Sequence, residues 1–227
     1  MGETVEFPSN GHTVQGYLAI PQSGSGEGPG VVVIQEWWGL VPHIKDVCER
    51  LASEGFVALA PDLYHGHSAS EPGEAQKLMM SMKMDEAARD MGGAVQYLID
   101  HDATEGETVG SVGFCLGGGL SLYLATLRPE VDACVVYYGV LPGVQPDLSQ
   151  VRGAVLGHYA EHDDFASPAA AQELKSRLET QGVPVEFHQY DGTSHGFFND
   201  SRPEVYNPEA SRRSWDRTLA FYRERLG

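Results

Sequence analysis

Apolar runs alternate with amphipathic helical segments over most of this 227-residue chain, and the alternation constrains the fold more than any other feature. Runs that are apolar on both faces predict strands buried in a parallel sheet, and the helices between them predict crossovers that cover its faces. We expect strands at residues 30–34, 56–60, 109–114, 133–138, 154–158 and 185–189, and helices at 44–53, 84–99, 169–180 and 208–225. The pattern predicts an α/β fold with a doubly wound, mostly parallel sheet, in a single domain over residues 1–227.

A hairpin is expected ahead of the alternating part. Residues 5–7 and 14–19 have strand-like patterns, and the turn Ser9-Asn10-Gly11 lies between them. Asparagine and glycine tolerate the positive φ that tight hairpin turns require, so the two segments predict an antiparallel pair.

A thiol lies at one predicted strand-to-helix corner. The segment GFCLGGG at residues 113–119 ends the strand 109–114 and leads into a helix that continues over 121–127. Glycines on both sides of Cys115 allow a strained backbone, and a helix N-terminus beneath the sulfur favours a thiolate. The amide of Leu116 would face a developing oxyanion. A buried structural thiol would not need these glycines, so the pattern predicts a nucleophile for acyl transfer.

Polar side chains follow two later strands, at the sheet edge where catalytic groups are found in such folds. His195 lies in a glycine-flanked loop after the strand 185–189 and is a candidate base for the thiol. Asp163 and Asp164 follow the strand 154–158, and either could orient the imidazole through Nδ1 or cap the next helix. We expect Asp163 to orient His195 and Asp164 to face solvent.

Glu36 is a further candidate, because it follows the strand 30–34 beside Trp37 and Trp38. A charged group at the mouth of an apolar strand needs a partner or a chemical role. We interpret Glu36 as a second acid/base group near the thiol, and a surface turn residue is the alternative.

A metal site is not expected. His65 and His67 flank one glycine, but no carboxylate or cysteine lies at ligand spacing around them. Histidines placed in this way are typical of a pocket rim or a surface, so the sequence predicts no metal ion.

Composition excludes some partners. The formal net charge of −17 argues against nucleic acids and anionic membranes, which bind basic patches. Three cysteines without paired spacing are typical of a reducing compartment, and Cys48 and Cys134 fit small core residues. We find no signal pattern at the start and no apolar run of about 18 residues, so we expect a cytoplasmic protein.

Four ordered motifs resemble those of one known family. They are QEWWGL at residues 35–40, PDLY at 61–64, GFCLGG at 113–118 and HGFF at 195–198. Their order and their spread over nearly the whole chain resemble the dienelactone hydrolase (carboxymethylenebutenolidase) family, which has the α/β-hydrolase fold. The resemblance implies a monomer without a metal or organic cofactor that opens an enol-lactone ring through a cysteine acyl-enzyme.

The resemblance also implies roles for individual residues. Cys115 would be the nucleophile and His195 the base, with Asp163 orienting the imidazole. Glu36 would hold the resting thiol protonated and accept its proton when substrate binds, because a carboxylate near a thiol opposes a second negative charge. The oxyanion hole would consist of the backbone amides of Leu116 and Trp37.

One part of the family pattern is missing. Family members that act on dienelactone bind its carboxylate with two arginines, one ahead of the helix before the corner and one shortly after the histidine. Here the first segment, residues 70–80, offers only Lys77, and the nearest arginine after His195 is Arg202. The candidate substrate-binding residues are Trp38, Tyr64, Lys77, Phe197 and Arg202.

Other functions stay open. The same residues would serve a broader carboxylesterase or lactonase that acts on small uncharged esters. A thiol-based binding or sensor protein without efficient turnover is a second alternative, although a sensor does not need a complete triad. A serine esterase is the weakest alternative, because no serine occupies the corner; its candidates would be Ser111, Ser121 and Ser194.

Overall fold

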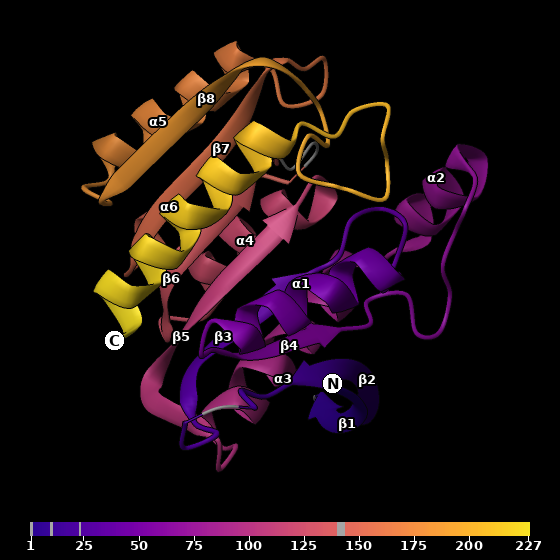
Figure 1. Ribbon diagram of the computed structural model, residues 1–227, viewed down its shortest axis with the longest axis vertical. Helices are drawn as coiled ribbons and strands as arrows, with labels where there is room; N and C mark the ends of the chain where they lie inside the picture. The colour runs from indigo at the N-terminus through magenta and orange to yellow at the C-terminus, as the bar shows by residue number, and fades with distance from the viewer. Residues whose placement is uncertain (1, 10, 23, 140–143) are drawn as a thin grey trace. The chain divides into compact units, whose positions relative to one another are not determined.

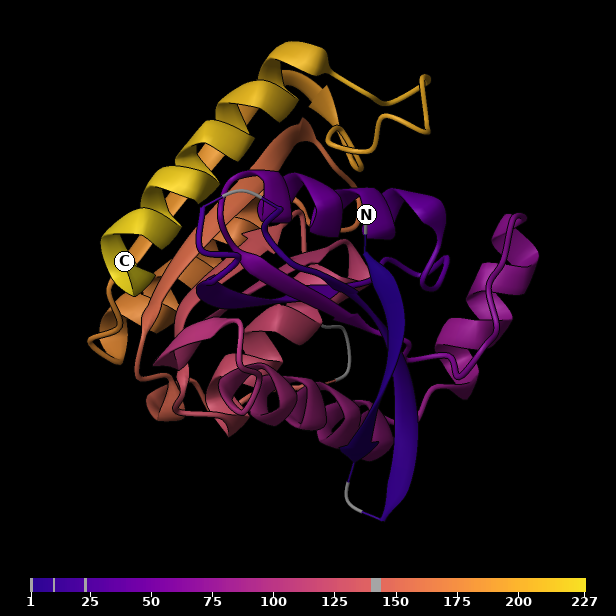
Figure 2. The same ribbon diagram turned by 60° about the horizontal axis from the view of Figure 1, so that its bottom comes forward.

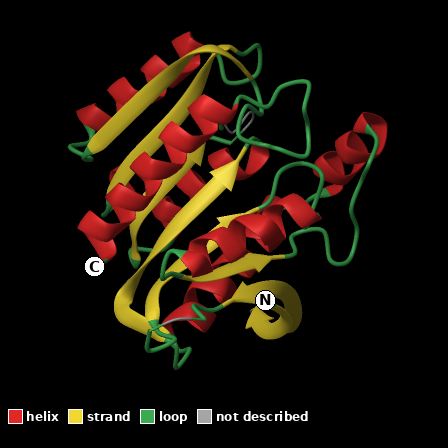
Figure 3. Cartoon of the chain, in the orientation of Figure 1, coloured by secondary structure: helices red, strands yellow, loops and turns green. Residues whose placement is uncertain are grey.

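A computed structural model describes residues 2–9, 11–22, 24–139 and 144–227 (Figure 1). The chain forms two compact units, Met1–Ser111 and Val112–Gly227. Strand β5 (Thr104–Phe114) begins in the first unit and ends in the second. Helices and strands alternate along the described ranges after the first two strands, as predicted (Figure 3). The single-domain prediction stays a prediction.

The first unit opens with the predicted antiparallel hairpin. Its strands are β1 (Glu3–Ser9), β2 (His12–Ala19), β3 (Gly28–Ile34) and β4 (Val57–Pro61), in the order β1-β2-β4-β3. Ser9 pairs with His12, which confirms the hairpin, and Asn10 of the predicted turn lies outside the described residues. β2 is antiparallel to β4, and β3 is parallel to β4, so the change from antiparallel to parallel pairing occurs at β4.

Three helices belong to the first unit: α1 (Pro42–Ser53), α2 (Pro72–Ser81) and α3 (Met84–Ile99). α1 and α3 confirm the predicted helices, because each buries one apolar stripe. α2 was not predicted. Its sequence lacks such a stripe and Ala75 is its one buried residue, so periodicity carries no signal there. Figures 1 and 2 show α2 standing apart from the other helices of its unit.

The second unit is parallel throughout its later strands. After the end of β5 it contains β6 (Val131–Tyr137), β7 (Ala154–His162) and β8 (Val185–Ser194), which pair in that order. Its helices are α4 (Leu116–Leu127), α5 (Pro168–Thr180) and α6 (Pro208–Leu226), with the short 3-10 helix η1 (Leu148–Gln150). α6 packs along β6 and β7 (Figure 1), and α5 packs on β7 and β8. The mostly parallel α/β arrangement is confirmed.

Strands β7 and β8 run further than predicted. Sequence periodicity ends them near residues 158 and 189, but they continue to His162 and Ser194, which pair with each other across a register irregularity. The added residues are mainly polar, so alternation of apolar side chains did not reveal them. The pairing places the residues that follow both strands at the same edge of the sheet.

Two of the three cysteines are core residues, as predicted. Cys48 and Cys134 are buried and free, whereas Cys115 is partly exposed. Within the described ranges, none of the helices combines the length and hydropathy needed to cross a lipid bilayer.

Candidate active site

Cys115 occupies a strained corner of the second unit, between the end of β5 and the start of α4. Its backbone has φ 55° and ψ −119°, a region that residues with a side chain rarely adopt. The amide of Cys115 donates to the carbonyl of Tyr137 at 3.0 Å, and its own carbonyl accepts from Gly118 at 3.0 Å. These two bonds hold the corner, with the sulfur at the N-terminus of α4.

Glycines make the corner possible through close backbone approach. A Cβ atom on Gly113 would lie 1.8 Å from the carbonyl oxygen of Gly117, and one on Gly118 would lie 2.8 Å from the carbonyl oxygen of Tyr137. No side chain fits at either distance, so the helix can start directly beneath the sulfur only with glycine at both positions. The amides of Leu116 and Gly117 lie at the N-terminus of α4, where backbone N–H groups stabilise negative charge.

Asp163 and His195 meet at the paired ends of β7 and β8. Oδ2 of Asp163 lies 2.7 Å from Nδ1 of His195, and its Oδ1 accepts from the amides of Phe165 and Ala166 at 2.8 and 2.9 Å. The Asp163 side chain has no exposed surface. Burial alone would favour the neutral acid, but the hydrogen bond and charge of His195, with the two amides, lower the pKa of Asp163. The carboxylate is therefore ionised, and both of its oxygens are hydrogen-bonded.

His195 links Asp163 to the thiol. Burial opposes a charge on the imidazole, yet hydrogen bonds to Asp163 and Cys115, and the negative charges of both, raise the pKa of His195 to about 10. Because Asp163 occupies Nδ1, Nε2 is the nitrogen that faces the sulfur. The structure thus brings Cys115, His195 and Asp163 together in one unit.

Two aromatic residues beside His195 were missed by sequence reasoning. The ring of Tyr138 lies 5.1 Å from the imidazole in an edge-on arrangement, and the ring of Phe165 lies 5.3 Å from it. Tyr138 has a positive φ of 37°, and Phe165 is 75% exposed. Tyr138 could have been found from its place at the end of a strand, whereas nothing in the sequence marks Phe165.

The alternatives to these residues are placed differently. Asp164 is exposed, whereas its neighbour Asp163 is buried against His195. Ser111 and Ser121 have no exposed surface, so neither can meet a substrate. Ser194 is exposed at the end of β8, and the strained corner is occupied by Cys115.

Several of the remaining candidates belong to the first unit. Glu36 follows β3 and is 3% exposed, and Trp37 and Trp38 are partly exposed, with ring centroids 5.0 Å apart. Tyr64 is buried in the loop after β4, and Lys77 is exposed on α2. The roles of these residues toward a substrate stay predictions.

Phe197 and Arg202 belong to the second unit. Phe197 has no exposed surface and packs on Tyr138 and Tyr190, which makes it a core residue. Arg202 donates to Glu204 through Nε at 2.9 Å, and its Nη1 lies 3.8 Å from where a Cβ on Gly196 would be. A guanidinium therefore lies next to the turn that carries His195.

Comparison with known proteins shows the family of the chain. A model described as "Dienelactone hydrolase family" matches residues 14–226. The chain is 39% identical to "Protein usf" of Aquifex pyrophilus and 36% identical to "Putative carboxymethylenebutenolidase" of Aquifex aeolicus, with 100% of each chain covered in both cases. A crystal structure of "Putative Dienelactone Hydrolase" from Klebsiella pneumoniae superposes with a TM-score of 0.89 at 26% identity, covering 99% of this chain and 98% of the other. The chain therefore belongs to the dienelactone hydrolase family and is a carboxylic ester hydrolase with the α/β-hydrolase fold.

Proposed function

We propose that the protein opens small enol-lactones of the dienelactone type through an acyl-enzyme on Cys115. The observation that carries the proposal is the position of His195, which is hydrogen-bonded to Asp163 on one side and to the strained Cys115 on the other. Nucleophile, base and orienting group in this arrangement support acyl transfer. The names of relatives that include carboxymethylenebutenolidase support the choice of a lactone.

In the first step the sulfur attacks the lactone carbonyl. Because the pKa of His195 is raised to about 10, the imidazole holds a proton at Nε2 near neutral pH and stabilises negative charge on the attacking sulfur. A C–S bond forms, and the amide of Leu116 stabilises the oxyanion. The ring C–O bond then breaks, and the departing enol oxygen takes the proton from Nε2, leaving a thioester and a neutral imidazole.

In the second step water hydrolyses the thioester. Neutral His195 accepts a proton from the water through Nε2 while the oxygen attacks the acyl carbon. The C–S bond breaks and releases the carboxylic acid, and the thiolate and imidazolium are restored. Asp163 holds Nδ1 throughout, so the ring keeps its orientation.

Initial rates of dienelactone ring opening, followed by ultraviolet absorbance, test the proposal. We expect the wild-type protein to open the ring and Cys115→Ala to lose at least about 1,000-fold in kcat. Cys48→Ala is the matched control, because it removes a buried thiol from α1, and it should retain the wild-type rate.

Other outcomes separate the parts of the proposal. Activity retained in Cys115→Ala would overturn the cysteine nucleophile. Thiol-dependent cleavage of an aryl ester, without lactone opening, would overturn the substrate and leave the mechanism in place. Labelling of Cys115 by an electrophile, without turnover of either substrate, would favour a sensor.

One observation favours the second candidate function, hydrolysis of small uncharged esters. Arg202 is engaged by Glu204 through both Nε and Nη2, so its charge is partly neutralised before any substrate arrives. Lys77 offers only a point charge on an exposed helix. A substrate without a carboxylate would need neither residue.

The proposal also includes the protein's setting. A reducing compartment such as the cytoplasm fits the three free cysteines, one of which must stay reduced to react. The family resemblance implies a monomer. Light scattering of the purified protein would test the monomer, and a stable dimer would contradict it.

A further inference from the structure

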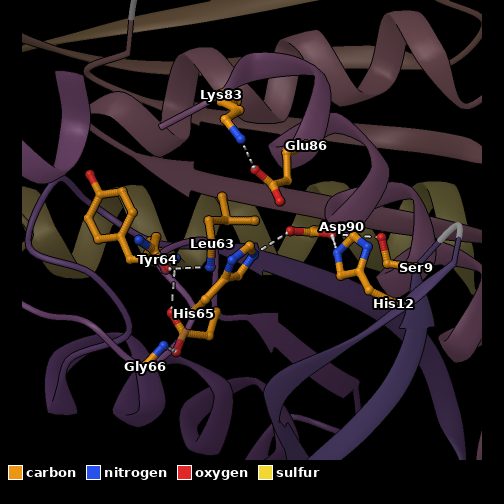
Figure 4. A network of polar contacts seen from close by, with 11 residues as sticks. Ser9, His12, Leu63, Tyr64, His65, Gly66, Lys83, Glu86 and Asp90 are labelled. Atoms are coloured by element: carbon orange, nitrogen blue, oxygen red, sulfur yellow. Dashed lines mark hydrogen bonds and ion pairs between the residues drawn. The ribbon is translucent and has the colours of Figure 1, made fainter. Parts of the chain in front are cut away.

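Two histidines converge on one buried carboxylate in the first unit (Figure 4). Nε2 of His12 lies 3.0 Å from Oδ1 of Asp90, and Nε2 of His65 lies 2.8 Å from Oδ2. The three groups come from the start of β2, the loop after β4 and the middle of α3. Their ligand atoms all lie within 4.8 Å of one another. Nothing in the proposed hydrolase mechanism uses this cluster.

The geometry points to a binding site for a borderline divalent cation such as Zn²⁺, and we propose that His12, His65 and Asp90 ligate it. Two imidazole nitrogens and one carboxylate oxygen are a ligand set that zinc takes in proteins. A tetrahedral ion holds such atoms roughly 3.4 Å apart, so each Nε2 would move about half an ångström from the oxygen that it now contacts. Each histidine would move its hydrogen from Nε2 to Nδ1 and present a lone pair to the ion.

Asp90 is held in place by a further contact. Its side chain is fully buried, and the hydroxyl of Ser9 donates to Oδ1 at 2.6 Å. A hydroxyl on the outer side of a carboxylate ligand orients it, as the outer contacts of metal sites do. The one contact described for Oδ2 is with Nε2 of His65, so this oxygen can turn a lone pair toward an ion.

His65 is presented by a fixed turn. Its backbone has a positive φ of 51°, and the buried carboxylate of Asp62 accepts from the amides of Tyr64 and Gly66 at 3.1 and 2.7 Å. These bonds hold the imidazole toward Asp90. A ligand held in position loses little entropy on binding.

The site is open to solvent on one side. The side chains of His12 and His65 are 38% and 43% exposed, whereas Asp90 is not exposed at all. His65 also lines a cavity of about 130 Å³, beside Tyr64, Lys83 and Glu86. An ion could therefore enter from solvent, and a water could fill a fourth position.

Titration calorimetry with ZnCl₂ tests the site in the full chain carrying Cys115→Ala, because that change keeps the reactive thiol from binding zinc. We expect one ion per chain and a rise in Tm on loading. His12→Gln should weaken binding by at least about tenfold while keeping a donor toward Asp90. His65→Asn is the second variant, since asparagine tolerates the left-handed backbone, and it should weaken binding to a similar extent.

His67→Gln is the matched control, because His67 is an exposed histidine of the same loop and makes no contact with Asp90 among those described. It should bind zinc like its parent. Absence of 1:1 binding in the parent, or equal affinity in His12→Gln, would overturn the site and leave a hydrogen-bonded clamp between the hairpin and α3. Circular dichroism would show that the exposed His12 position tolerates the change without unfolding.

Discussion

Nδ1 of His195 and Oδ2 of Asp163 lie 2.7 Å apart although 32 residues separate them in the chain. The pairing of His162 with Ser194 produces this contact, because each residue directly precedes one member of the pair. The geometry of this pair thus depends on the register of β7 and β8. A shift by one residue would turn the side chains to opposite faces.

Asp163→Asn should lower kcat on any ester that the protein hydrolyses by roughly 100- to 10,000-fold, because an amide no longer secures the right tautomer of His195. Steady-state kinetics measure the loss. Asp164→Asn is the matched control, since Asp164 is the exposed neighbour, and it should stay close to wild type. Equal losses in the two variants would contradict the assignment of Asp163.

Stability should depend on pH through His195. Its pKa in the folded protein is raised to about 10, above an ordinary value of 6.5, so the stabilisation is complete below pH 6.5 and disappears as pH rises through about 10. Urea unfolding of wild type and His195→Gln should show the largest difference in unfolding free energy near pH 6. The difference in unfolding free energy should shrink again below pH 3.8, the ordinary pKa of an aspartate side chain. The pKa of Asp163 is lowered in the folded protein, so the stabilisation from its ionised form is lost as the pH falls through that lowered pKa. A difference that grows from pH 7 to 10 would contradict the charge on His195.

Gly113→Ala should destabilise the protein by several kcal/mol or prevent folding, because the new Cβ would lie 1.8 Å from the carbonyl oxygen of Gly117. Gly73→Ala is the matched control. Its Cβ would meet nothing within 4 Å at the start of α2, so it should be neutral or slightly stabilising. Urea unfolding compares the two. A mild effect at Gly113 would show that the corner can relax.

Arg202→Gln should separate the two candidate substrates. A charge-assisted hydrogen bond to a carboxylate contributes about 1.5–3 kcal/mol, so kcat/KM for a lactone that carries a carboxylate should fall roughly 10- to 150-fold. An uncharged aryl ester should react at the wild-type rate. Arg212→Gln, at an exposed position of α6, is the control and should change neither. Equal losses on both substrates would mean that Arg202 supports the His195 turn instead of binding substrate.

Helix α2 and the ends of β7 and β8 show where sequence reasoning stopped. Periodicity detects segments that bury one apolar face, and α1, α3 and the centres of the strands have such a face. α2 buries only Ala75, so it has no apolar face for periodicity to detect. The ends of β7 and β8 are mainly polar, and the pairing between the two strands keeps them extended. The ends of β7 and β8 are therefore decided by contacts distant in the chain.

The cluster of His12, His65 and Asp90 could not be predicted from the sequence for a related reason. The sequence shows His65 and His67 close together without a carboxylate at ligand spacing. In the structure the carboxylate comes from Asp90, which is 25 residues away from His65 in the chain. The second histidine is His12, which is 78 residues away from Asp90. Only the packing of the hairpin and the loop on α3 brings them together.

The sequence by itself determined the kind of fold, the strand-to-helix corner at Cys115 and the family, because these depend on local pattern: apolar periodicity, glycines at a close approach and motifs in order. The tertiary structure decided which of Asp163 and Asp164 contacts His195, since only Asp163 is buried against it. It also placed Phe197 in the core and Arg202 beside the His195 turn. Burial and partnership depend on strand register, and no local window of sequence contains that information.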